Sequence, residues 1–162
     1  MTDAEGVLRF SERSSYQDAV GELLAHVSRT LDIFDTDLTG TGLAHSQRVA
    51  QLSDALAGDA RASVRIALHD PSALQHHMPR LWDLCSAQSH RIQIRQTPRQ
   101  LRHLSETFML TTGGYALIRT HSEYWRGKLL RGDPVESAGY AGRFADLWEA
   151  CSCCISTTKL GL

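Results

Sequence analysis

The chain has 162 residues, 42% of them hydrophobic and 22% charged, which is typical of one globular domain and excludes wholesale disorder. Its formal net charge of −1 argues against a protein that is held on nucleic acid or on a membrane by bulk charge. No apolar run reaches the ~18–20 residues of a membrane span, and the polar start does not resemble a signal peptide. We therefore expect a cytoplasmic protein with reduced cysteines.

The first third of the chain predicts two helices with a strand between them. Ser14 and Gln17 have the spacing of a capping box, and apolar residues then recur every three or four positions, which indicates a helix. Residues 31–35 are short and partly apolar and predict a strand. A second helix is predicted over residues 46–57, with Gly58 as its stop.

The middle of the chain continues this alternation. Apolar residues at every second position predict a strand over residues 64–68. Residues 74–85 carry helical spacing, and Pro79 is expected at a helix start or a kink. A third strand is predicted around residues 92–94 and ends before Pro98.

The pattern then changes. Two short strands over residues 107–110 and 115–118, joined by a Gly–Gly turn, predict a hairpin. An irregular stretch follows, and the last helix is expected from about residue 134 to residue 151. The order of elements predicts an α/β fold with a mixed, largely parallel β-sheet flanked by helices. No linker or repeat interrupts it, so we expect a single domain over residues 1–162.

Polar side chains follow each of the three predicted strands. They are Asp35 and Asp37 after the first, His69 and Asp70 after the second, and Arg95 and Gln96 after the third, with His103 one short turn later. If these strands run parallel, the side chains line one rim, which is where α/β sheets bind ligands. Together they could bind a polar ligand or perform acid–base chemistry. The alternative is that each aspartate caps the helix that follows it, which is the commoner role for a single aspartate.

No metal site and no cofactor are predicted. The adjacent His76 and His77 would point about 100° apart on a helix and would not chelate one ion together. Cys151, Cys153 and Cys154 lack further ligands at zinc-finger spacing. Cys151 fits the apolar face of the last helix, whereas a redox role of the other two cysteines is left open.

Basic residues flank the predicted rim in the sequence. They are Arg91, Arg95, Arg99, Arg102, Arg119, Arg126, Lys128 and Arg131. Such a group could bind phosphate. Scattered arginines more often form a solvated or ion-paired face, so both interpretations stand at this point.

The order of these elements resembles one half of the phospholipase D superfamily. In that family a strand leads to a His-x-Lys-(x)₄-Asp motif on a hairpin, and the histidine attacks phosphorus. Two halves, from one chain or from a homodimer, form one active site. Carried over, the resemblance places His103 at the nucleophile, Ser105 at the lysine and Leu110 at the aspartate. It therefore implies a degenerate half without the phosphate-binding lysine.

A closer resemblance is to uncharacterised bacterial phospholipase D-like domains, some of which are joined to a GNAT-type acetyltransferase. The similar segments are residues 33–35, 69–71, 95–98, 101–104 and 126–128. This resemblance implies the fold and an acetyltransferase as a possible partner, and it implies no known activity.

Three hypotheses follow. The first is a non-catalytic accessory module that binds a phosphate-containing ligand or a partner protein through the rim, at Asp35, His69, Arg95, His103 and Arg119. The second is a phosphodiesterase in which His103 is the nucleophile and arginines replace the lysine. The third is an interaction protein that pairs with a second copy of itself or with an acetyltransferase.

Overall fold

The strands form one sheet in the computed structural model, which describes residues 6–151 and 153–156. The strand order is β1-β7-β6-β5-β2-β3-β4-β8. The strands are β1 (Gly6–Phe10), β2 (Thr30–Asp35), β3 (Ser63–Leu68), β4 (Ile92–Gln96), β5 (Thr107–Thr111), β6 (Tyr115–Arg119), β7 (Gly127–Arg131) and β8 (Cys153–Cys154). The α-helices are α1 (Arg13–Ala25), α2 (Ser46–Gly58), α3 (Ser72–His77), α4 (Pro79–Ala87) and α5 (Pro134–Ala150).

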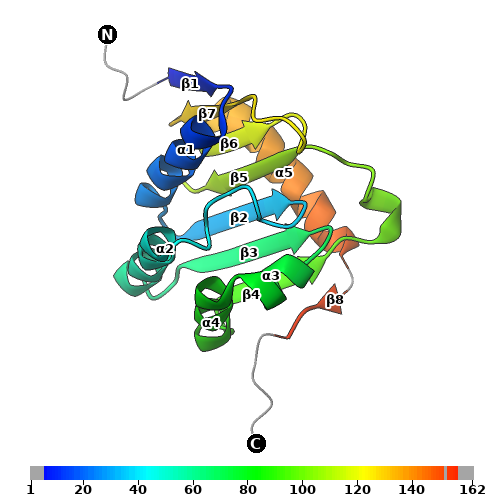
Figure 1. The fold of residues 1–162 in the computed structure, drawn as a ribbon. Helices are drawn as coiled ribbons and strands as arrows, with labels where there is room; N and C mark the ends of the chain where they lie inside the picture. Colours follow the sequence, from blue (N-terminus) through cyan, green and yellow to red (C-terminus); the bar gives the residue numbers. More distant parts are fainter. Residues whose placement is uncertain (1–5, 152, 157–162) are drawn as a thin grey trace, which may run out of the picture.

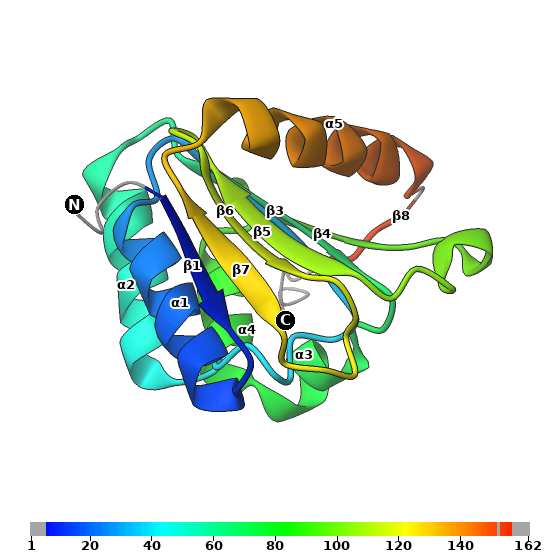
Figure 2. The same ribbon diagram turned by 90° about the horizontal axis from the view of Figure 1, so that it is seen from above.

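Helices cover both faces of this sheet. Helices α1 to α4 lie on one face, and α5 lies alone across the other (Figures 1 and 2). The predicted fold class, a mixed sheet flanked by helices, is confirmed. Parallel pairing is confined to β2, β3 and β4, so the parallel part is smaller than predicted. The reason is that the β5–β6 hairpin, β7 and β1 all add to the sheet in antiparallel pairs.

Some element boundaries differ from the sequence prediction. Helix α1 begins at Arg13 after Glu12, and no side chain caps it, so the predicted capping box at Ser14 is wrong. The third helical segment is two helices, and Pro79 begins the second of them, as expected for a residue that lacks a backbone N–H. Strands β1 and β7 were not predicted, because β1 is mostly exposed and β7 lies between two glycines.

Strand alternation divides the interior into two hydrophobic clusters, because successive side chains point to opposite faces. In β2, Ile33 packs in the cluster beneath α1, α2 and α4, whereas Phe34 packs in the cluster beneath α5. Phe108 and Phe144 belong with Phe34 in this second cluster. The same alternation decides on which face each polar side chain at the strand ends lies.

Gly127 provides a direct test of how the sheet is packed. It lies in β7 between Phe10 of β1 and Arg119 of β6. A β-carbon there would lie 2.2 Å from the Ile118 carbonyl oxygen and 2.7 Å from the Phe10 ring. We expect Gly127→Ala to lower the free energy of unfolding by about 1–3 kcal/mol, measured by urea denaturation.

Gly139 is the matched control, because a β-carbon on this exposed helical position of α5 meets no atom within 4 Å. Gly139→Ala should raise the free energy of unfolding by about 0.5–1 kcal/mol. If Gly127→Ala unfolds at the urea concentration of the wild type, the close packing of β1 and β6 around Gly127 is wrong.

Candidate functional site

A hollow of about 240 Å³ opens where β2 and β6 end. Asp35 is the last residue of β2 and Arg119 is the last residue of β6. Thr107, the first residue of β5, pairs with Arg119 and lies between these two strands. The side chains around the hollow are those of Asp35, Thr36, Asp37, Thr39, Arg119, Ser122 and Trp125, and Gly40 completes its lining.

Arg119 is buried and held on several sides. Its guanidinium lies 4.5 Å from the centre of the Tyr16 ring and 4.8 Å from that of the Trp125 ring. Its Nε donates to Thr107 Oγ1 at 3.3 Å, and its Nη1 donates to the Tyr124 carbonyl at 3.4 Å. Stacking between aromatic faces suits the flat, weakly hydrated guanidinium, so the cation is fixed at this position.

Asp35 is the buried counterpart of Arg119. Its Oδ2 accepts the Leu38 N–H at 2.8 Å, and Leu38 adopts a positive φ of 70° in the turn that follows. Burial raises the pKa of Asp35 to about 6, although the Arg119 guanidinium acts in the opposite direction. Asp35 Oδ1 and Arg119 Nη2 lie 3.9 Å apart, which is longer than a hydrogen bond. The Asp35 carboxylate and the Arg119 guanidinium therefore attract each other without forming a direct hydrogen bond.

Tyr16 and Asp37 complete the surroundings of this pair. Burial, followed by the nearby Asp35 carboxylate, raises the pKa of Tyr16, so its phenol stays neutral. Asp37 Oδ1 accepts from both the backbone N–H and the hydroxyl of Thr39. The hollow therefore presents hydrogen-bond donors and acceptors side by side.

Two residues of the predicted rim lie on the other face of the sheet. His69 Nδ1 lies 2.6 Å from Thr97 Oγ1 and its Nε2 lies 2.8 Å from the Leu104 carbonyl, so both ring nitrogens have partners. The Arg95 guanidinium lies 4.2 Å from the centre of the Trp148 ring, beneath α5. The strand ends are parallel neighbours as predicted, but alternation along each strand turns these two side chains away from Asp35.

The other predicted site residues also lie outside the hollow. Asp70 is exposed and accepts the Ser72 N–H at 3.0 Å. Lys128 pairs with Glu136 of α5. His103 is exposed in the turn after a short 3₁₀ helix (Arg99–Leu101). The structure thus brings Asp35, Asp37 and Arg119 together. Asp35 and Asp37 accept backbone N–H groups in the turn after β2, whereas Asp70 accepts the N–H of Ser72, the first residue of α3.

The sequence analysis missed the aromatic residues that hold Arg119. Tyr16 comes from α1 and Trp125 from the loop after β6, and no sequence pattern connects them. Gly40 is a partial sign in the sequence that a large side chain packs there, because a β-carbon at this position would lie 2.7 Å from the Trp125 ring. A glycine that flanks a polar strand end is compatible with the close approach of another group.

The described residues contain no group of three or more His, Cys, Asp or Glu side chains that could hold a metal ion. Cys85 and Cys151 are buried, and burial raises the pKa of both thiols. The side chains of Cys153 and Cys154 lie outside the described part, so their redox role stays open.

None of the helices that the structure describes is long and apolar enough to cross a membrane.

The family model described as "Domain of unknown function (DUF7931)" matches residues 12–160. The chain belongs to this family. No curated protein matches it. The fold of this DUF7931 domain is nevertheless similar to that of solved structures.

A phospholipase D family member, Nuc from Salmonella typhimurium, superposes with a TM-score of 0.62 at 9% identity, over 91% of this chain and 96% of that one. TrmBL2, an archaeal chromatin protein described as showing a novel mode of DNA binding, superposes with a TM-score of 0.65 at 13% identity. That match covers 94% of this chain and 55% of TrmBL2, so the domain spans about half of that protein. At these identities the likeness shows the fold alone, and the expected phospholipase D-like fold is confirmed.

The raised pKa of Asp35 can be measured directly. We expect its carboxyl carbon to titrate with an NMR midpoint near pH 6, because burial disfavours the charged form. Asp70 is the internal control, since hydrogen bonds to Ser72 lower its pKa below the ordinary value of 3.8.

The raised pKa of Asp35 should also make the free energy of unfolding depend on pH. Between pH 3.8 and about 6 the folded chain binds more protons at Asp35 than the unfolded chain does, so this group lowers the free energy of unfolding as the pH rises. Asp35→Asn should remove that contribution to the pH slope. Equal slopes for variant and wild type would contradict the burial of this carboxyl.

Proposed function

We propose that this DUF7931 protein is a phospholipase D-like domain without phospholipase D catalysis, and that it serves as an accessory module binding a small, phosphate-containing polar ligand. The observation that carries the proposal is the separation of 3.9 Å between Asp35 Oδ1 and Arg119 Nη2. A distance of this size between polar groups leaves room for a bridging group. A hydroxyl is the group that both donates to a carboxylate and accepts from a guanidinium.

Burial strengthens such a bridge. Asp35 and Arg119 are 4% exposed each, so their charges are poorly screened by water and interact strongly with a bound group. Both residues line the hollow, and Thr39 and Ser122 add hydroxyl groups to its wall. The ligand that suits this wall is small and rich in hydroxyls.

Two features argue against phosphodiester cleavage at this hollow. Among the described residues that line it, none is a histidine or a lysine, so the histidine nucleophile and the phosphate-binding lysine of the phospholipase D motif are lacking there. The motif of the phospholipase D superfamily lies on a hairpin, but His103, which the resemblance places at the nucleophile, lies before the β5–β6 hairpin. The same spacing started at the first hairpin residue falls on Thr107, Met109 and Gly114, which cannot replace the motif either.

A homodimer and an acetyltransferase partner rest on the resemblance alone. The binding proposal names residues of one chain and makes no claim about a second copy. Light scattering at micromolar concentration would detect a dimer, and its result would leave the ligand proposal untouched.

Ligand binding can be tested with a variant that fills the hollow. We expect thermal-shift and calorimetric titrations to detect binding within a panel of sugar phosphates, nucleotides and inorganic phosphate. Ser122→Phe should abolish it, because the larger ring occupies the space in front of Asp35 and Arg119 and leaves both in place. Ser89→Phe, at an exposed position in a turn, is the matched control and should bind as the wild type does.

This test can fail in two ways. If no compound of the panel binds to the wild type at millimolar concentration, the module does not bind small phosphate-containing ligands. If binding occurs and Ser122→Phe retains it, the ligand binds elsewhere on the domain.

The enzymatic alternative makes the opposite prediction at His103. We expect neither the wild type nor His103→Ala to hydrolyse bis(p-nitrophenyl) phosphate above the buffer rate, because this exposed histidine lies outside the hollow. Hydrolysis by the wild type that is lost in His103→Ala would overturn the non-catalytic proposal in favour of a phosphodiesterase.

A further inference from the structure

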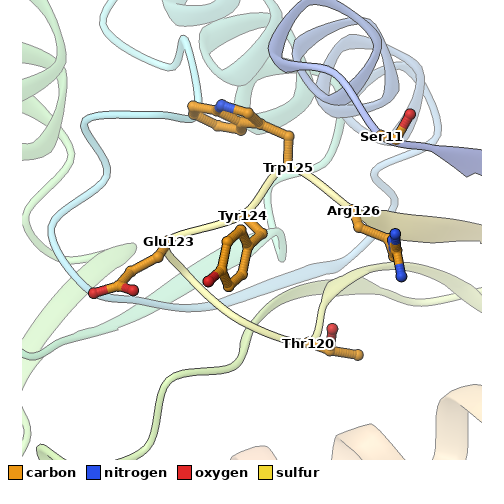
Figure 3. Close-up of a pocket in the computed structure, with 6 residues that line it drawn as sticks. All are labelled: Ser11, Thr120, Glu123, Tyr124, Trp125 and Arg126. Atoms are coloured by element: carbon orange, nitrogen blue, oxygen red, sulfur yellow. The ribbon is translucent and has the colours of Figure 1, made fainter.

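A second hollow adjoins the one at Asp35 and has a volume of about 480 Å³. Its lining comes mainly from the loop between β6 and β7, and Trp125 lines both hollows. Figure 3 shows the Tyr124 and Arg126 side chains on one side of this loop and the Trp125 ring turned to the other side. The lining residues are Ser11, Thr120, Glu123, Tyr124, Trp125 and Arg126.

Arg119 also positions this loop. Its Nη1 donates to the Tyr124 carbonyl, and its guanidinium lies against the Trp125 ring. The turn is fixed further by the His121 ring, whose Nδ1 accepts the Glu123 N–H at 3.1 Å. Because Arg119 lines the first hollow and contacts two residues that line the second, it fixes their relative position before any ligand arrives.

An aromatic side chain is exposed in the second hollow. Tyr124 is 64% exposed, one of three large hydrophobic side chains that are exposed in the described residues. A large ring exposed beside a hollow is a feature of binding surfaces. The Tyr124 ring provides a flat aromatic surface in the lining of the second hollow.

The far end of the second hollow is basic. Arg126 and Ser11 line it and also line a third hollow of about 310 Å³, together with Arg9. Arg9 and Arg126 are both exposed, and their forked guanidinium groups match phosphate geometry. The acidic Asp35 thus lines the first hollow and the basic Arg126 lines the second, and Trp125 lines both.

We propose that the adjoining hollows bind one phosphorylated sugar, with its hydroxyl groups between Asp35 and Arg119, the apolar face of its ring on Tyr124, and its phosphate at Arg126. This inference rests on the proposed function and names the ligand class. The carboxylate–guanidinium pair lines the first hollow, and Tyr124 and Arg126 both line the second.

The experiment is a set of calorimetric titrations with ribose 5-phosphate, glucose 6-phosphate and inositol 1-phosphate. The unphosphorylated sugars and inorganic phosphate are titrated in parallel. We expect at least one sugar phosphate to bind about tenfold or more tightly than its unphosphorylated sugar and than inorganic phosphate.

Two variants locate the phosphate and the ring. Arg126→Gln should bind the sugar phosphate about tenfold more weakly, and should reduce the difference between the sugar and its phosphate. Tyr124→Ala should weaken the sugar and its phosphate by the same factor, because the ring contact is common to both. Both residues are exposed, so folding should persist, and Arg80→Gln on the exposed side of α4 is the matched control.

The outcomes separate this inference from the proposed function. Inorganic phosphate binding as tightly as every sugar phosphate, or an unchanged preference for phosphate in Arg126→Gln, would overturn the sugar-phosphate assignment. If Ser122→Phe still abolishes binding in that case, the proposed function stands. If none of these compounds binds to the wild type, both proposals fail.

Discussion

A buried guanidinium connects the parts of this domain that meet at the open ends of β2 and β6. Arg119 contacts α1 through Tyr16, β5 through Thr107 and the following loop through Trp125 and Tyr124. A charge removed from water is costly unless aromatic faces, hydrogen bonds or an opposite charge surround it. The elements around Arg119 therefore depend on one another, and the loop that lines both hollows depends on them.

The layers of the fold could be predicted from local patterns, whereas the site could be predicted only in part. Alternating apolar residues identified β3, and the two glycines identified the β5–β6 hairpin. Strand β1 lacked such a pattern because its residues are largely exposed. Such local patterns indicate which residues of a segment are buried. They do not indicate which strands, distant in the sequence, lie side by side in the sheet.

The predicted rim of polar side chains at the strand ends shows the same limit of prediction from local patterns. Asp35 and Arg95 both end strands of the parallel part, and the sequence correctly placed them at one edge. Their separation follows from the register, because Asp35 faces α1 and Arg95 faces Trp148 of α5. One residue of shift would have reversed this arrangement, and such a shift is not encoded in the composition of either strand. Trp125 was unpredictable for another reason, since its partners are distant in the sequence.

The two borders of the sheet have a consequence for behaviour at high concentration. A border strand carries unpaired backbone groups that invite another molecule to add a strand, which is a route to aggregation. At one border β8 pairs with β4, and this strand has two residues in the part of the chain that the structure describes. At the other border β1 pairs along the five residues of β7. A two-residue strand offers far less template for intermolecular pairing than a five-residue one, so addition of a strand from another molecule is favoured at β1 over β8.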